Sequence, residues 1–183
     1  MRGLVAFLRA LGASRSGVAL VEFAICMPVL FVMYMCVFVL SDELSCSRKT
    51  TITARTMADL TSRYASLTPS SLQTIMAASG QVMTPYTTGT STARISELLV
   101  TSPTTASVVW SQSLTGSTMT TGLATGTVVV LPLNMATTGT YLILGEMTYV
   151  YQPVIGLGSN AALTLYDKSY MSPRISNAIP LSS

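Results

Sequence analysis

Ser16-Gly17-Val18-Ala19-Leu20-Val21-Glu22-Phe23 opens an apolar run that extends to Leu40. Residues 18–40 carry one charged side chain, that of Glu22. At about 1.5 Å of rise per residue, a helix of this length covers the hydrocarbon core of a bilayer, which is about 30 Å thick. The sequence therefore predicts a membrane-spanning helix over residues 18–40, and no second apolar run is long enough to form another.

Glu22 is the unusual residue of this span. A charged side chain costs about 2.5–3.5 kcal/mol at the centre of a bilayer and less near its surface. A carboxylate in a medium of low dielectric is tolerated when a cation neutralises it. Glu22 therefore either meets a positively charged partner or extends its carboxylate to the interface without one.

The flanks of the span predict its orientation. Arg2, Arg9 and Arg15 precede it without any acidic residue, whereas Asp42 and Glu43 follow it directly. Lys and Arg close to a span mark its cytoplasmic end. We expect the N-terminus in the cytoplasm and everything after Leu40 outside it, which in a bacterium means the periplasm.

Composition argues against catalysis and against nucleic-acid binding. The 183 residues include no histidine, so histidine-dependent triads are excluded. No S-x-x-K motif, nucleophile elbow or complete phosphate-binding loop is present. Without residues 1–17, the chain has seven basic and seven acidic residues and no basic patch. We expect no enzymatic activity, no cofactor or metal, no small-molecule substrate and no nucleic-acid partner.

After the span, the sequence predicts more helix. No glycine occurs from Val18 to Ser79, and glycine and proline are the main signals of turns. Pro28 predicts a kink over residues 24–31. The helix is expected to continue beyond the membrane as a stalk, because one stripe recurs at helical spacing, namely Met57, Leu60, Tyr64 and Leu67. Span and stalk together would form one helix of about 50 residues. Thr68-Pro69 as a helix start and Gly80 as a helix stop predict a short second helix.

Beyond Gly80, Thr, Ser, Gly and β-branched residues predict an antiparallel sheet. The expected strands are residues 95–101, 107–111, 127–133, 141–151 and 163–171, and Ser102-Pro103-Thr104-Thr105 is an expected hairpin connection. Residues 114–126 are expected to be a loop, either a surface excursion or a contact loop. Alternation places two sets on single strand faces: Ala106, Val108 and Trp110, and Tyr141, Ile143, Met147, Tyr149 and Tyr151. Pro132 should end a strand or lie on an edge.

Several side chains leave alternatives open. Glu146 is either a solvent-facing residue or the partner of Arg94 or Arg174 in an ion pair that fixes strand register. The tyrosines are either packing residues with wet hydroxyls or an adhesive surface. Cys26, Cys36 and Cys46 are ten residues apart on one helix, too far for an intrachain disulfide. Two alternatives remain for Cys46. Its thiol either forms a disulfide with another subunit or is a site of lipid attachment, although Glu43 three residues before it argues against lipid attachment.

The arrangement of a basic leader, Gly17, four residues, Glu22 and an apolar helix resembles the class III signal of prepilins. The run 18–24 followed by Met27-Pro28-Val29-Leu30 resembles TadE/TadF-like minor pseudopilins of the tight-adherence (Tad/Flp) pilus. Further matches, which together cover most of the chain, are Ala58-Asp59-Leu60, Pro85-Tyr86, residues 109–112, residues 145–153 and Pro173-Arg174. Among these, the order and spacing of residues 146–153 are the most specific. The head departs from the family in carrying few charges.

This resemblance implies a site and a function. A prepilin peptidase would cut between Gly17 and Val18, and Glu22 would meet the terminal amine of a neighbouring pilin-like subunit. Further implied partners are the inner-membrane pilus assembly platform and membrane lipid. The expected fold is α+β and pilin-like: a leader (1–17), a transmembrane helix (18–40), a stalk with a second helix (41–80) and a β-rich periplasmic head (81–183), which becomes extracellular if the subunit enters a pilus. The alternative is an uncleaved, membrane-anchored periplasmic interaction domain that joins no pilus.

Overall fold

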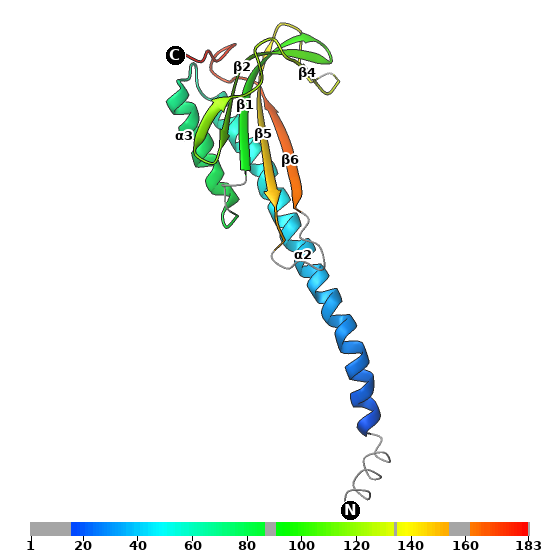
Figure 1. Ribbon diagram of the computed structural model, residues 1–183. Coiled ribbons are helices and arrows are strands. Elements are labelled where there is room, and N and C mark those ends of the chain that lie inside the picture. Colours follow the sequence, from blue (N-terminus) through cyan, green and yellow to red (C-terminus); the bar gives the residue numbers. More distant parts are fainter. Residues whose placement is uncertain (1–15, 87–90, 134, 154–161, 183) are drawn as a thin grey trace, which may run out of the picture.

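The computed structural model describes residues 16–86, 91–133, 135–153 and 162–182. It has one long N-terminal helix and a small antiparallel sheet, an α+β layout (Figure 1). The helices are α2 (Ser16–Ser62), α3 (Pro69–Gly80) and the 3-10 helix η1 (Gln81–Met83). The strands are β1 (Ser91–Ser102), β2 (Thr105–Thr115), β3 (Thr118–Thr121), β4 (Val128–Val130), β5 (Tyr141–Tyr151) and β6 (Leu163–Met171).

The sheet has the order β3-β2-β1-β5-β6, and β4 pairs with β2 beside β3. Every pair of these strands is antiparallel, as the sequence predicts. The predicted bounds of β5 and β6 are confirmed, and the expected hairpin connection joins β1 to β2 with Ser102 opposite Thr105. Pro132 follows β4, whose only strand partner among the described residues is β2.

Helix α3 confirms the predicted start and stop signals. The backbone N–H of Ser71 donates to the Thr68 hydroxyl at 3.2 Å, which satisfies one of the free donors of the first turn. Pro69 occupies the first helical position, and Gly80 is the last residue of the helix. The predicted inner face is buried, and it consists of Leu72, Ile75, Met76 and Ser79.

Helix α2 crosses one face of the sheet and then continues far beyond it (Figure 1). Its sheet-facing residues are small or polar with one large exception, Met57, and all are buried: Cys46, Thr50, Thr53, Ala54, Met57, Ala58, Thr61 and Ser62. They recur at spacings of three and four, so they share one stripe of the helix. They join the inner side chains of α3 and β5 in one hydrophobic core.

The predicted strands 95–101 and 107–111 are extended at both ends in β1 and β2, and the predicted strand 127–133 is shortened to β4. Three further expectations about the fold are wrong. The stripe from Met57 to Leu67 is interrupted because α2 ends at Ser62, so Tyr64 and Leu67 follow the helix instead of belonging to it. The expected loop 114–126 contains the end of β2 and all of β3, which pair through Leu114 and Met119.

The third error concerns a strand face. Trp110 lies opposite Glu97 and Val108 lies opposite Leu98, so one extra residue of β2, Val109, is accommodated between the two pairs. Such a bulge reverses the alternation of side chains along a strand. Trp110 therefore faces the helices, whereas Ala106 and Val108 belong to a second core on the opposite face of the sheet.

Candidate functional site

The first half of α2 is an apolar helix that nothing in the described chain covers. An 18-residue stretch of it is 0% buried with a mean hydropathy of 2.6, so this helix is long and apolar enough to cross a membrane. Its large side chains, such as Leu20, Phe23 and Leu30, are exposed on all sides. In water such a surface is costly by roughly 25 cal/mol per Å². The arrangement suits a hydrocarbon environment.

The predicted cleavage and assembly residues lie in the first two turns of this exposed helix. Gly17, Val18 and Glu22 are exposed, and α2 begins at Ser16, so the Gly17–Val18 bond lies in helical backbone. Among the described residues, Glu22 has no hydrogen bond or ion pair, and the head contributes nothing to this end of the helix. The leader residues 1–15 lie outside the described residues. Pro28 lies inside one continuous helix, and the kink over residues 24–31 stays a prediction.

The boundary between the exposed and packed halves of α2 is fixed by Asp42. The hydroxyl of Tyr86 donates to Asp42 Oδ1 at 2.7 Å, and that of Tyr151 donates to Oδ2 at 2.6 Å. The ring of Tyr86 also packs edge-on against Tyr149 and Tyr151, with centroids 6.1 and 6.4 Å away. Burial, and next the hydrogen bond to Asp42, raise the pKa of both Tyr86 and Tyr151. We call Asp42, Tyr86 and Tyr151 the collar.

Further polar contacts attach α2 to the head above the collar. The ammonium of Lys49 donates to the backbone oxygens of Val82 at 3.2 Å and Thr84 at 2.5 Å. Thr51 donates to Asp167 of β6, and Arg174 near the C-terminus pairs with Asp59. These contacts join the helix to segments that are distant in the sequence.

The helix approaches β5 most closely at Gly145. A Cβ atom at this position would lie 2.6 Å from the backbone oxygen of Ala54 and 3.2 Å from the Cβ of Ala58. Real Cβ atoms do not approach a backbone oxygen this closely, so only glycine fits without a shift of α2. Ala54 and Ala58 on the helix and Gly145 on the strand thus form a contact between two backbones.

Cys46 is 0% exposed in the packed half of α2. Burial raises the pKa of its thiol to about 11, so the reactive thiolate is scarce at neutral pH. Neither oxidation between subunits nor lipid attachment fits a side chain without accessible surface. Both expectations for Cys46 are therefore corrected: it is a packing residue of the core.

Glu146 forms the ion pair that the sequence left as one of two alternatives. It lies opposite Arg94 in the β1–β5 register, and Arg94 Nε donates to its carboxylate at 2.7 Å. The Tyr166 hydroxyl of β6 donates to the other carboxylate oxygen at 2.5 Å. The side chain of Glu146 is 8% exposed and that of Arg94 is 31% exposed, so a largely buried carboxylate with partly exposed partners links three neighbouring strands. Arg174 pairs with Asp59 instead.

A second carboxylate, Glu97, is buried and holds the C-terminal segment. Its Oε1 accepts the backbone N–H of Ile179 at 2.5 Å, while the indole of Trp110 donates to the Ile179 carbonyl at 2.8 Å. Burial raises the pKa of Glu97. Because both groups bind backbone of the same chain, this constellation has a structural role.

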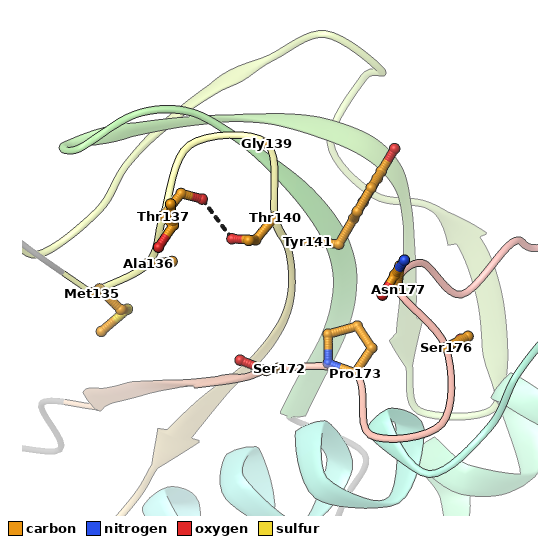
Figure 2. Close-up of a pocket in the computed structure, with 10 residues that line it drawn as sticks. All are labelled: Met135, Ala136, Thr137, Gly139, Thr140, Tyr141, Ser172, Pro173, Ser176 and Asn177. Carbon is orange, nitrogen blue, oxygen red and sulfur yellow. Dashed lines mark hydrogen bonds between the residues drawn. The ribbon is translucent and has the colours of Figure 1, made fainter.

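The head has an open hollow of about 620 Å³ (Figure 2). It lies between the segment before β5 and the segment after β6, and no charged side chain lines it. Thr140 donates to the Thr137 carbonyl at 2.6 Å across its rim. The lining residues are Met135, Ala136, Thr137, Gly139, Thr140, Tyr141, Ser172, Pro173, Ser176 and Asn177. These ten residues include no carboxylate, amine, imidazole or thiol that could act as a catalytic acid or base.

Sequence reasoning identified the exposed helix and its carboxylate but missed the collar. The sequence predicts Asp42 only as an acidic flank of the span, and it leaves Tyr151 among tyrosines that are either packing residues or an adhesive surface. The sequence signal is present only in retrospect: an acidic residue directly after an apolar run, with tyrosines 44 and 109 positions later. Within the described residues, no group of three or more acidic or cysteine side chains could hold a metal ion.

Comparisons with known proteins give no match: no family model, curated protein or solved structure is similar to this chain. The resemblance to TadE/TadF-like pseudopilins therefore rests on the quoted motifs alone.

Proposed function

We propose that this chain is a minor pseudopilin, processed by a prepilin peptidase and required for assembly of an adhesive Tad/Flp-type pilus. In this proposal the leader 1–17 stays in the cytoplasm and the helix 18–40 spans the inner membrane once. The head lies in the periplasm, or outside the cell once the subunit is in a pilus. The partners are the peptidase, the assembly platform, membrane lipid and other pilin-like subunits.

The observation that carries the proposal is the one carboxylate in the apolar and mostly exposed segment 18–40 of α2. Cleavage before Val18 would create an amine four residues before Glu22, on the same helical face. In a lone subunit, this amine and the carboxylate are one turn apart. In an assembly, the amine of a neighbouring subunit would neutralise Glu22 as the helix leaves the lipid and packs on other helices.

The decisive experiment is intact-mass analysis of the full chain purified from its native membrane. The proposal expects a mature protein that begins at Val18. Replacement of Gly17 by leucine should leave the leader attached, since the scissile position would no longer be small. A wild-type protein that retains Met1 would instead establish the membrane-anchored interaction domain.

Assembly is tested separately with Glu22→Ala. We expect normal insertion and cleavage, because the span becomes more apolar, together with loss of pili under the electron microscope. Glu43→Ala is the matched control, since it removes a carboxylate from the same helix outside the predicted span. Normal piliation in Glu22→Ala cells would reject the pairing role while leaving the cleavage site intact.

A further inference from the structure

The two edges of the sheet differ in how they are protected. At one edge, β6 carries Asp167 and Lys168 and packs along α2. On the other side, β4 consists of Val128, Val129 and Val130. Residues 98–145 around it contain no charged side chain. Charges, prolines and covering segments are the usual devices that keep a sheet edge from pairing with another chain. β4 is short, and Pro132 lies two residues beyond its end, but it carries no charge and no other described segment pairs with its outer edge.

The register shows which backbone groups of β4 are unpaired. Leu131 N–H donates to the Thr104 carbonyl at 2.8 Å, so Leu131 and Thr104 form a hydrogen-bonded pair. Pairs alternate along an antiparallel ladder, so Val129 also bonds to β2, while Val128 and Val130 direct their N–H and C=O groups outward. No other described segment bonds to those outward groups.

The side chains on this edge are also unusually exposed. Val128 is 66% and Val130 is 70% exposed, and Leu133 just beyond them is 71% exposed. The side chain of Val129, on the opposite face of the strand, packs against the second core. The strand therefore presents two free backbone positions and an apolar face. It lies on the end of the head that α2 does not cover (Figure 1).

We propose that β4 is a docking edge for β4 of a second copy of this chain. Antiparallel pairing about a two-fold axis through Val129 places Val128 of each copy opposite Val130 of the other. All four outward N–H groups then meet the four outward carbonyls in four hydrogen bonds. The exposed valines of both copies form one apolar cluster.

The absence of charge favours an identical partner. A two-fold axis brings each residue near its own copy, so any charge close to the axis would oppose a like charge and destabilise the pair. The segment 98–145 has none. The contact is smaller than a standard protein interface, so the two copies should associate in the membrane and separate in dilute detergent.

The test is disulfide trapping in the full chain in native membranes, with Cys26 and Cys36 replaced by alanine and buried Cys46 kept. Val129→Cys places two thiols on the two-fold axis at a non-hydrogen-bonded pair, where Cα atoms are about 4.5 Å apart, within disulfide range. We expect a covalent dimer under a mild oxidant. Thr120→Cys, on the exposed neighbouring strand β3, is the matched control and should stay monomeric.

Two further variants keep the test decisive. The first variant combines Val130→Pro with Val129→Cys. The proline removes an outward N–H that does not bond to β2, so the fold should persist. The yield of cross-linked dimer should fall at least tenfold. Co-expressed Val128→Cys and Val130→Cys chains should cross-link with each other more than either does alone. Equal trapping by Thr120→Cys, or no dimer in a folded Val129→Cys protein, would overturn the proposal. Uncleaved Gly17→Leu protein should still dimerise, which separates this proposal from the proposed pilin function.

Discussion

The two halves of α2 are continuous in backbone but face different surroundings. Residues 18–40 carry large apolar side chains around the whole helix, and most of these are exposed in the isolated chain. Residues 46–62 have a single buried stripe of mostly small side chains against the sheet, with arginines on the outer surface. The difference shows that side-chain size, and not only hydropathy, separates a helix suited to lipid from a helix that a sheet can approach closely.

The largest expected effect comes from a charge in the first half. Leu30 is 60% exposed, and Leu30→Arg should reduce membrane insertion by about 3 kcal/mol, or roughly 100-fold, because the guanidinium would lie near the bilayer centre. The fraction of protein that resists carbonate extraction from membranes measures this effect.

Ile52→Arg is the matched control for that prediction. Ile52 is 51% exposed on the same helix, on the outer side of the packed half, so a charge there should stay in water and leave insertion unchanged. Equal loss of insertion by both variants would show that the two halves do not differ in environment.

The next effect concerns the packed half. Gly145→Ala should lower the free energy of unfolding of the head by about 1–3 kcal/mol, because the new methyl group collides with the backbone of α2. Urea unfolding in detergent micelles, followed by the fluorescence of Trp110, measures it. Thr148→Ala on the same strand is the control and should change stability little. Equal losses of stability in both variants would show that Gly145 has room for a methyl group beside α2.

The smallest effect lies at the boundary. Asp42→Asn should cost about 1–2 kcal/mol, since an amide replaces a charged acceptor of two tyrosine hydroxyls. Glu43→Gln next to it is the control. Hydrogen exchange at the end of β5 should rise in Asp42→Asn alone, and unchanged exchange would show that the collar does not hold β5 to the helix.

The collar also predicts a pH dependence. The pKa of Tyr86 and of Tyr151 is raised in the folded chain, so above the ordinary tyrosine pKa of 10.0 the unfolded chain loses these protons first. Stability is therefore fully present below about pH 10 and falls as pH rises beyond it. Tyr151→Phe should reduce the steepness of this alkaline loss in unfolding measurements between pH 9 and 11.

Local patterns were sufficient wherever one periodicity dominated. The apolar run, the capping signals of α3 and the alternation of β5 each depend on neighbouring residues, and each matches the structure. The patterns failed at Val109, where one extra residue reverses the face of Trp110, and at β3, whose Thr-rich composition resembles a loop. A bulge and a short edge strand are fixed by the partner strand.

The sequence by itself determined an apolar N-terminal helix with one carboxylate, an antiparallel head and the absence of histidine chemistry, because composition and periodicity are local properties. Only the tertiary structure decided that Asp42 binds two tyrosines, that Cys46 is buried, and that Glu146 pairs with Arg94. The tyrosines of the collar lie 44 and 109 residues after Asp42, and Arg94 and Glu146 are 52 residues apart. Contacts over such separations depend on how the helix crosses the sheet, which no short stretch of sequence encodes.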